Sequence, residues 1–208
     1  MQPTSRPFLA TASIALAAAL ATALAGAPTG TRAAATATEA QPSQAAGPVA
    51  TTAATETAFA TALATFNRAL AGEDAALAIA TTQFQALLAA DPTQPAFRAF
   101  LGSATAMKAR TTLLPWKKMG YADDGLAQID KALAQLTPGH DRQTLGGVAT
   151  SALVRFTAGS TFVALPSMFN RSDRGARLLD DLRKSAVLAA APAAFRAQVL
   201  AQPLPKAP

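Results

Sequence analysis

Large apolar side chains recur every three or four residues through most of the segment from Glu56 to Leu136. This spacing places them in one stripe along a helix, whereas a half-buried strand would need apolar and polar residues to alternate. The runs are separated by glycine or proline, which are unfavourable inside helices. The apolar residues of the first run are Phe59, Leu63, Phe66 and Leu70. We therefore expect an all-α fold.

The composition agrees with a helical fold and excludes several kinds of chemistry. Half of the residues are apolar but only 6% are aromatic, and much of the remainder is alanine, the best helix former. The chain has no cysteine, so disulfides, thiolate nucleophiles and thiolate metal sites are excluded. The net charge of +6 is moderate for 208 residues and does not by itself indicate nucleic-acid binding.

The first 26 residues have the pattern of a secretory signal peptide. A short start with one charge, Arg6, precedes an uncharged run rich in alanine and leucine, and Pro28 follows that run closely. We expect cleavage near Ala25 or Ala27, which gives a periplasmic or secreted protein without an integral membrane segment. Anchoring by an uncleaved N-terminal segment is the alternative.

The sequence predicts one domain between two segments of low complexity. Residues 27–54 are rich in alanine, threonine and proline and almost free of large apolar side chains, which is typical of a disordered linker. We expect a single helical domain from 55 to 202, because this length suits one core. Residues 203–208 form a proline-rich tail.

The first four predicted helices pair into two antiparallel hairpins. Gly72 separates the first helix from the second, and Pro92 ends the second. Pro95 begins the third helix, and Asp123 with Asp124 caps the fourth. Between the third and fourth helices we expect a long loop, residues 111–121.

Three further helices are predicted after Pro138, which gives about seven in total. An apolar stripe from Leu145 to Val163 predicts the fifth helix, and its glycines allow a neighbour to approach closely. The sixth helix is capped by Asn170 or Ser172 and extends through Leu188. The seventh begins at Pro192. The glycines of the fifth helix are Gly146, Gly147 and Gly159.

The two hairpins resemble tetratricopeptide-type helical repeats. The spacing of the second helix of such a repeat is found at Ala80, Phe84, Leu87 and Pro92. In the next hairpin, matching positions are found at Gly102, Gly125, Ile129 and Ala132. The first helix lacks the large aromatic residue and the glycine of the family, and Pro138 follows Pro92 by more than the usual ~34 residues. The resemblance covers at most residues 56–138 and implies a short stack of hairpins.

The sequence offers no assembled catalytic or metal site. The only histidine, His140, lies in a Pro-Gly-His-Asp turn, and we expect it to be a turn or capping residue. The carboxylate pairs Asp123-Asp124 and Asp180-Asp181 are adjacent on helices, where neighbours point about 100° apart and do not converge on one ligand. We expect capping from the first pair and solvent-exposed ion pairing from the second. No cofactor or metal is predicted.

A partner-binding surface is predicted around the long loop, because the segment from Pro92 to Ala122 has five basic residues and no acidic one. Its candidate residues are Trp116, Lys117, Lys118, Tyr121, Lys108 and Arg110. An anionic polymer, an acidic peptide or an anionic surface of lipid headgroups suits this combination of cations and aromatic rings. The tryptophan either anchors the loop by burial or stands exposed as a binding hot spot. Arg98 is the fifth basic residue of the segment, and a second basic cluster comprises Arg171, Arg174 and Arg177.

Three functions are compatible with these features. The first is a non-enzymatic interaction module of the cell envelope, whose paired helices hold a peptide or a helix of a protein partner. The second is a binder of a small apolar or lipid-like ligand, in a cavity between helices lined by Phe100, Phe156 and Phe162. The third is an enzyme that uses carboxylates and arginines alone. Nucleic acid is disfavoured as a partner by the predicted export.

Overall fold

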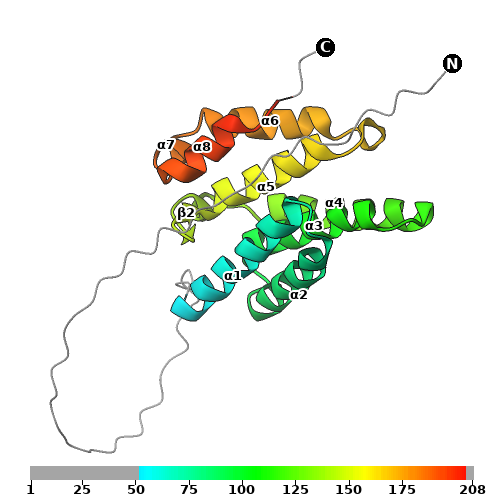
Figure 1. Ribbon diagram of the computed structural model, residues 1–208. Helices are drawn as coiled ribbons and strands as arrows, with labels where there is room; N and C mark the ends of the chain where they lie inside the picture. The colour runs from blue at the N-terminus through cyan, green and yellow to red at the C-terminus, as the bar shows by residue number, and fades with distance from the viewer. Residues whose placement is uncertain (1–51, 205–208) are drawn as a thin grey trace, which may run out of the picture.

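The computed structural model describes residues 52–204 and confirms the all-α prediction (Figure 1). The predicted signal peptide, most of the linker and residues 205–208 of the tail lie outside the described residues. Helix already begins at Ala53, so the last two residues assigned to the linker are helical. Within residues 52–204 no helix combines the length and the apolar character needed to span a membrane.

This part of the chain contains eight α-helices and one short β-hairpin. The helices are α1 (Ala53–Leu70), α2 (Asp74–Ala90), α3 (Pro95–Thr111), α4 (Pro115–Ala134), α5 (Thr150–Ala164), α6 (Ser172–Arg183), α7 (Ala186–Ala189) and α8 (Ala193–Ala201). The shorter elements are the 3-10 turns η1 (Pro138–Asp141) and η2 (Ser167–Phe169) and the strands β1 (Thr144–Leu145) and β2 (Val148–Ala149).

The helices form two groups that meet at α3 and α5. In the first group each helix packs on the next, α1 on α2, α2 on α3 and α3 on α4. In the second group α5 packs on α6, and α6 contacts α7 and α8. Figure 1 shows α5 between α3 of the first group and α6 of the second.

Phenylalanine rings form the centre of the first group. Phe59 of α1 is fully buried and lies within 6.4 Å, between ring centroids, of Phe84, Phe97 and Phe100. Phe84 and Phe100 are stacked with centroids 5.1 Å apart, whereas most other pairs meet edge to face. Such pairs stabilise a core beyond the area that they bury. The apolar stripe predicted for the first helix therefore points into this cluster.

A pair of glycines lies where the helices of each group cross most closely. A Cβ on Gly125 of α4 would lie 2.6 Å from the backbone of Gly102 and Ala106 in α3. A Cβ on Gly175 of α6 would likewise lie 2.8 Å from the carbonyl oxygen of Gly159 in α5. The close approach predicted for Gly159 is thus present, and only glycine fits these crossings without moving backbone.

The prediction of a long loop at residues 111–121 is wrong, because most of this segment is helical. Only residues 112–114 connect α3 to α4, and α4 begins at Pro115. Proline favours the first helical turn, because its fixed φ suits the helix and its missing N–H has no partner to lose there. Asp123 and Asp124 consequently lie on an exposed part of α4, not in its first turn, so the predicted capping role is also wrong.

Gly146 and Gly147 do not belong to the fifth helix, as the sequence suggested. Both have positive φ values, 59° and 73°, and form the turn between β1 and β2. Two consecutive residues with positive φ are typical of a tight hairpin turn, which glycine adopts most readily. The Gly146 N–H donates a hydrogen bond of 2.7 Å to the Glu56 carboxylate, which connects this hairpin to the first turn of α1.

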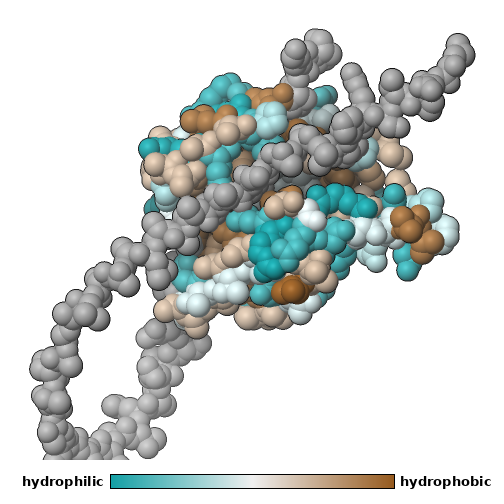
Figure 2. Space-filling model, viewed as in Figure 1, coloured by the Kyte–Doolittle hydropathy of each residue, from teal (hydrophilic) through white to brown (hydrophobic). Residues whose placement is uncertain are grey.

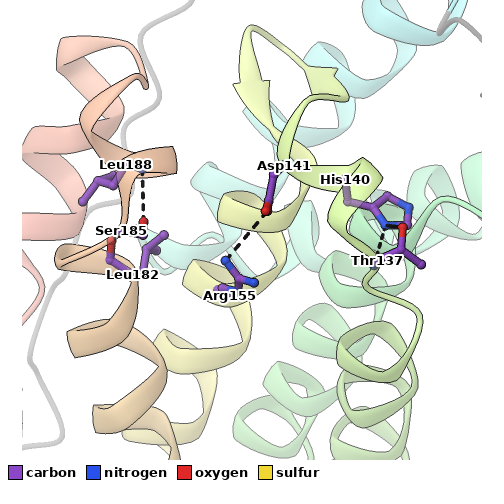
Figure 3. Close-up of polar contacts among 7 residues, drawn as sticks. All are labelled: Thr137, His140, Asp141, Arg155, Leu182, Ser185 and Leu188. Carbon is purple, nitrogen blue, oxygen red and sulfur yellow. Dashed lines mark hydrogen bonds and ion pairs between the residues drawn. The ribbon is translucent and has the colours of Figure 1, made fainter.

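Side-chain hydrogen bonds cap two of the helical elements that follow α4 (Figure 3). The backbone N–H of Thr137 donates to Nδ1 of His140 at 2.9 Å, which confirms the capping role predicted for this histidine. The Ser185 hydroxyl donates to the carbonyl oxygen of Leu182 and accepts from the Leu188 N–H. This serine separates α6 from α7, so the predicted sixth helix is divided. The start of α6 also differs from the prediction. The capping residue is Arg171, not Asn170 or Ser172, and its side chain makes no capping hydrogen bond.

Candidate ligand cavity and adjoining tip

A cavity of about 920 Å³ lies between the two helix groups. Its walls come from α1, α3 and the start of α4 on one side, and from α5, the α5–α6 connection and α8 on the other. Most of its lining is aliphatic or aromatic, as in Phe66, Phe100, Met107, Leu153, Phe156 and Phe195. Pockets that bind small molecules have volumes of roughly 300–1,000 Å³, so this cavity has the size of a ligand site.

Two of the three phenylalanines that were predicted to line a cavity do line this one. Phe100 and Phe156 line it, but Phe162 does not. The ring of Phe162 is fully buried on the opposite side of α5, where it packs with Leu126 and Ile129 of α4. The prediction for Phe162 is therefore wrong, because helix α5 has apolar residues on two faces and covers a different neighbour with each.

Six uncharged polar side chains line a cavity that is mostly apolar. They are Ser103 of α3 and, from the second group, Thr157, Ser160, Thr161, Gln198 and Gln202. The hydroxyls of Thr161 and Ser103 are hydrogen-bonded to each other at 2.9 Å. Within residues 52–204, the buried Ser160 hydroxyl and the Gln198 amide have no hydrogen-bond partner. Buried polar groups without a partner are costly, so two on one cavity wall indicate a place where a ligand or water completes the hydrogen bonds.

The rim of the cavity is positively charged. Arg110 and Lys118 are the charged residues of its lining, and no acidic side chain among the described residues takes part. Exposed residues of the rim include Pro115 and Met119 at the start of α4, with Met168 in η2 across the opening. Methionine is flexible and polarisable, which suits an opening that admits ligands of varied shape.

Next to the rim, the end of α3 and the start of α4 form a projection, residues 110–119, here called the α3–α4 tip. Figure 1 shows one end of α4 extending beyond the neighbouring helices, and Figure 2 shows brown, hydrophobic surface there. Leu113 is 92% exposed and Trp116 is 69% exposed. The interpretation of Trp116 as a buried anchor is therefore wrong, and the alternative of an exposed aromatic residue holds.

The six residues predicted to bind a partner are close in sequence to this tip but differ in exposure. Trp116, Lys117 and Lys118 lie in the exposed first turn of α4. Tyr121 is half-buried one turn later, and Lys108 is half-buried near the end of α3. The Arg110 guanidinium donates to the carbonyl oxygen of Ala69 at 3.1 Å, so Arg110 also holds the end of α1.

Among the other basic residues highlighted by the sequence, Arg98, Arg171 and Arg174 have structural contacts, whereas Arg177 is exposed. Arg98 donates to the side-chain oxygens of Gln128 and Gln135, each at 3.0 Å, and so joins α3 to α4. Arg171 and Arg174 both pair with Asp130 of α4, at 3.1 and 2.5 Å, and both lie over the Phe162 ring. We infer that these contacts fix α6 against α4 and α5 and do not form a free basic surface.

The acidic residues do not gather into a metal site in the described part of the chain. Within residues 52–204 no group of three or more histidine or carboxylate side chains is placed to hold a metal ion. Asp180 accepts from Lys184 one helical turn away at 2.5 Å, which raises the pKa of that lysine. The ion pairing predicted for this carboxylate pair is thereby confirmed for Asp180.

Sequence reasoning missed Ser160 and Gln198, the two unpaired polar residues of the cavity. A signal was present for the first, since Thr157, Ser160 and Thr161 interrupt the apolar stripe of α5. Small hydroxyl residues are common in helices, however, and usually bond to the backbone carbonyl one turn earlier, as Thr161 also does.

Comparison with family models, characterised proteins and solved structures finds no match to this chain.

Proposed function

We propose that this protein binds an apolar or amphipathic, lipid-like molecule in the cavity between its two helix groups. The single observation that supports this is the cavity of about 920 Å³ with a mostly apolar lining. Because the N-terminal sequence has the pattern of a signal peptide, we also propose that the protein is located in the cell envelope, where lipid-like molecules are exchanged. The charged residues at the rim, Arg110 and Lys118, suit a ligand with an anionic or strongly polar head.

The character of the cavity argues against water as its natural occupant. Because the cavity opens to solvent at its rim, water can enter it, but most of its lining offers no hydrogen-bond partner. Each buried water molecule needs about two to four polar partners, so an apolar ligand suits most of this space better than water does.

A protein partner, the function that the sequence favoured first, stays a prediction. The tetratricopeptide-like stacking that it implies is supported by the sequential packing of α1 to α4 and by the contact of Gly102 with Gly125. Those features explain the fold of the first group, but they do not account for a large apolar cavity between the groups. For that reason we prefer the ligand as the proposed function.

The proposed function is tested by narrowing the cavity. Ala164 is an exposed residue of α5 that lines the cavity, and Ala197 is an exposed alanine of α8 that does not. We expect Ala164→Trp to weaken ligand binding about 10- to 100-fold, because overpacking costs roughly 1–3 kcal/mol. Ala197→Trp should leave it unchanged. Binding is measured by displacement of a fluorescent fatty-acid probe, and retained ligands by native mass spectrometry.

Two results would contradict the proposal. One is that protein purified under native conditions carries no small molecule and also fails to bind fatty acid, lysolipid or alkane probes. The other is that the probe binds equally well to both tryptophan variants, since its site would then lie outside the cavity.

The polar groups of the cavity allow a second prediction, in which stability and affinity change in opposite directions. We expect Ser160→Ala to raise the free energy of unfolding of the ligand-free protein by about 1 kcal/mol, because it removes a buried hydroxyl that has no partner in residues 52–204. It should weaken binding of a ligand with a polar head, but not of a plain hydrocarbon. Urea unfolding and probe displacement give the two values.

Ser151→Ala is the matched control for this prediction. Ser151 lies on the same helix and is fully buried, and its hydroxyl also lacks a partner among the described residues, but it does not line the cavity. Its replacement should raise stability by a similar amount and leave binding unchanged. Equal loss of affinity in both variants would show that Ser160 does not contact the ligand.

A further inference from the structure

We propose that the α3–α4 tip docks on the anionic surface of a lipid bilayer and brings the opening of the cavity against the bilayer. The docking surface goes beyond ligand binding, although its link to the cavity rests on the proposed function. It consists of the exposed apolar side chains of the tip and the cations beside them.

Exposed apolar residues are concentrated at this tip. Seven large apolar side chains are exposed within residues 52–204, and four of them lie in the tip. Those four are Leu113, Leu114, Trp116 and Met119. Exposure of such a group to water is unfavourable, and a contiguous apolar patch usually marks an interaction surface. Tryptophan next to lysine is the combination that favours the boundary between lipid headgroups and acyl chains.

The charge of the tip complements anionic lipid. Arg110, Lys117 and Lys118 lie within it, and no carboxylate of the described residues forms an ion pair with any of them. The nearest acidic residues along α4 are Asp123 and Asp124. At 1.5 Å per residue, Asp123 lies about 10 Å along the helix from Trp116. The tip can therefore enter the interfacial region, about 5–10 Å deep, before a carboxylate reaches it.

The position of the tip favours a bilayer over an acidic protein as its partner. Pro115, Lys118 and Met119 belong both to the tip and to the cavity lining. Docking on a membrane therefore places the opening beside the lipid phase, from which an amphipathic ligand can enter without crossing water. An acidic protein on the same surface would cover this side of the rim and give the cavity no source of ligand.

The experiment uses the full chain and its only tryptophan, Trp116, as the probe. Vesicles of phosphatidylcholine with phosphatidylglycerol are expected to shift the tryptophan emission to shorter wavelength, and brominated lipids to quench it. Vesicles of phosphatidylcholine alone should have a much smaller effect. Because the signal comes from the tip, it is specific even if another segment of the chain holds the protein on the vesicle. Salt near 1 M should weaken docking, since it shortens the Debye length to about 3 Å.

Matched variants separate the tip from the rest of the surface. We expect Leu113→Gln combined with Lys117→Gln to weaken vesicle binding by at least about tenfold, through lost apolar burial and lost attraction to anionic lipid. Neither residue lines the cavity, so probe binding in solution should be unchanged. The control, Leu200→Gln combined with Lys131→Gln, removes an exposed leucine and a lysine elsewhere and should bind vesicles normally.

The two proposals fail in different ways. Docking of Ala164→Trp, measured by vesicle flotation, should be normal although its ligand affinity is low. The docking proposal is overturned if anionic vesicles leave the Trp116 emission unchanged, or if they shift and quench it equally in the tip and control variants. It is also overturned if polyglutamate shifts the emission and vesicles do not, since the tip would then be a surface for acidic proteins. None of these results affects ligand binding in solution, which tests the cavity alone.

Discussion

Replacing Phe59 by alanine is expected to lower the free energy of unfolding by about 3–5 kcal/mol, the range observed when a buried phenylalanine is truncated. Phe59 is fully buried, and its ring contacts those of Phe84, Phe97 and Phe100. Its loss opens a space at the point where α1, α2 and α3 meet. The change is measured by urea unfolding followed by far-UV circular dichroism, because Trp116 lies outside the core.

Phe59→Leu is the control for this prediction. Leucine keeps most of the buried volume, so we expect a much smaller loss, less than about 1.5 kcal/mol if the neighbouring rings adjust. A loss of similar size in both variants would mean that the edge-to-face ring contacts, and not the filled volume, determine the stability of this cluster.

Replacing Gly125 by alanine is expected to destabilise the protein by about 3 kcal/mol, although alanine is the better helix former. The added Cβ would lie 2.6 Å from the Ala106 nitrogen and from the Gly102 oxygen. Both are backbone atoms, so a rotamer change cannot relieve the contact and the helices α3 and α4 must separate. The midpoint of urea unfolding should fall accordingly.

Gly120→Ala gives the same chemical change in the same helix without the contact. A Cβ at Gly120 has no neighbour within 4 Å, so alanine should stabilise the protein by up to about 1 kcal/mol. Opposite signs for the two variants are expected. A neutral or stabilising effect of Gly125→Ala would contradict the close crossing of α3 and α4.

The sequence predicted the first three helices well, because their boundaries depend on local signals. Gly72, Pro92 and Pro95 stop or start helices through backbone restrictions that need no tertiary context. The same rule applied to Pro115 would have placed the start of α4 correctly. Asp123 and Asp124 gave a competing capping signal, and that signal led to the prediction of a long loop.

The cavity could be predicted only in part. Phe100 and Phe156 were identified because they belong to apolar stripes, but a stripe does not show which neighbour it faces or whether the space beside it is filled. Phe162 illustrates the first difficulty, since it covers α4 from the other side of α5. The volume of the cavity depends on how α5 and α8 pack against α1 and α3, and no local pattern encodes that distance.

The glycine contacts have a mechanical consequence for the cavity. Within each crossing pair, α3 with α4 and α5 with α6, backbone touches backbone, so these helices cannot move closer and lose their main contact if they separate. Between the pairs, α5 contacts both α3 and α4, and Arg171 and Arg174 of α6 pair with Asp130 of α4. A ligand that needs more room than about 920 Å³ would therefore have to move one rigid pair against the other, at the expense of these contacts.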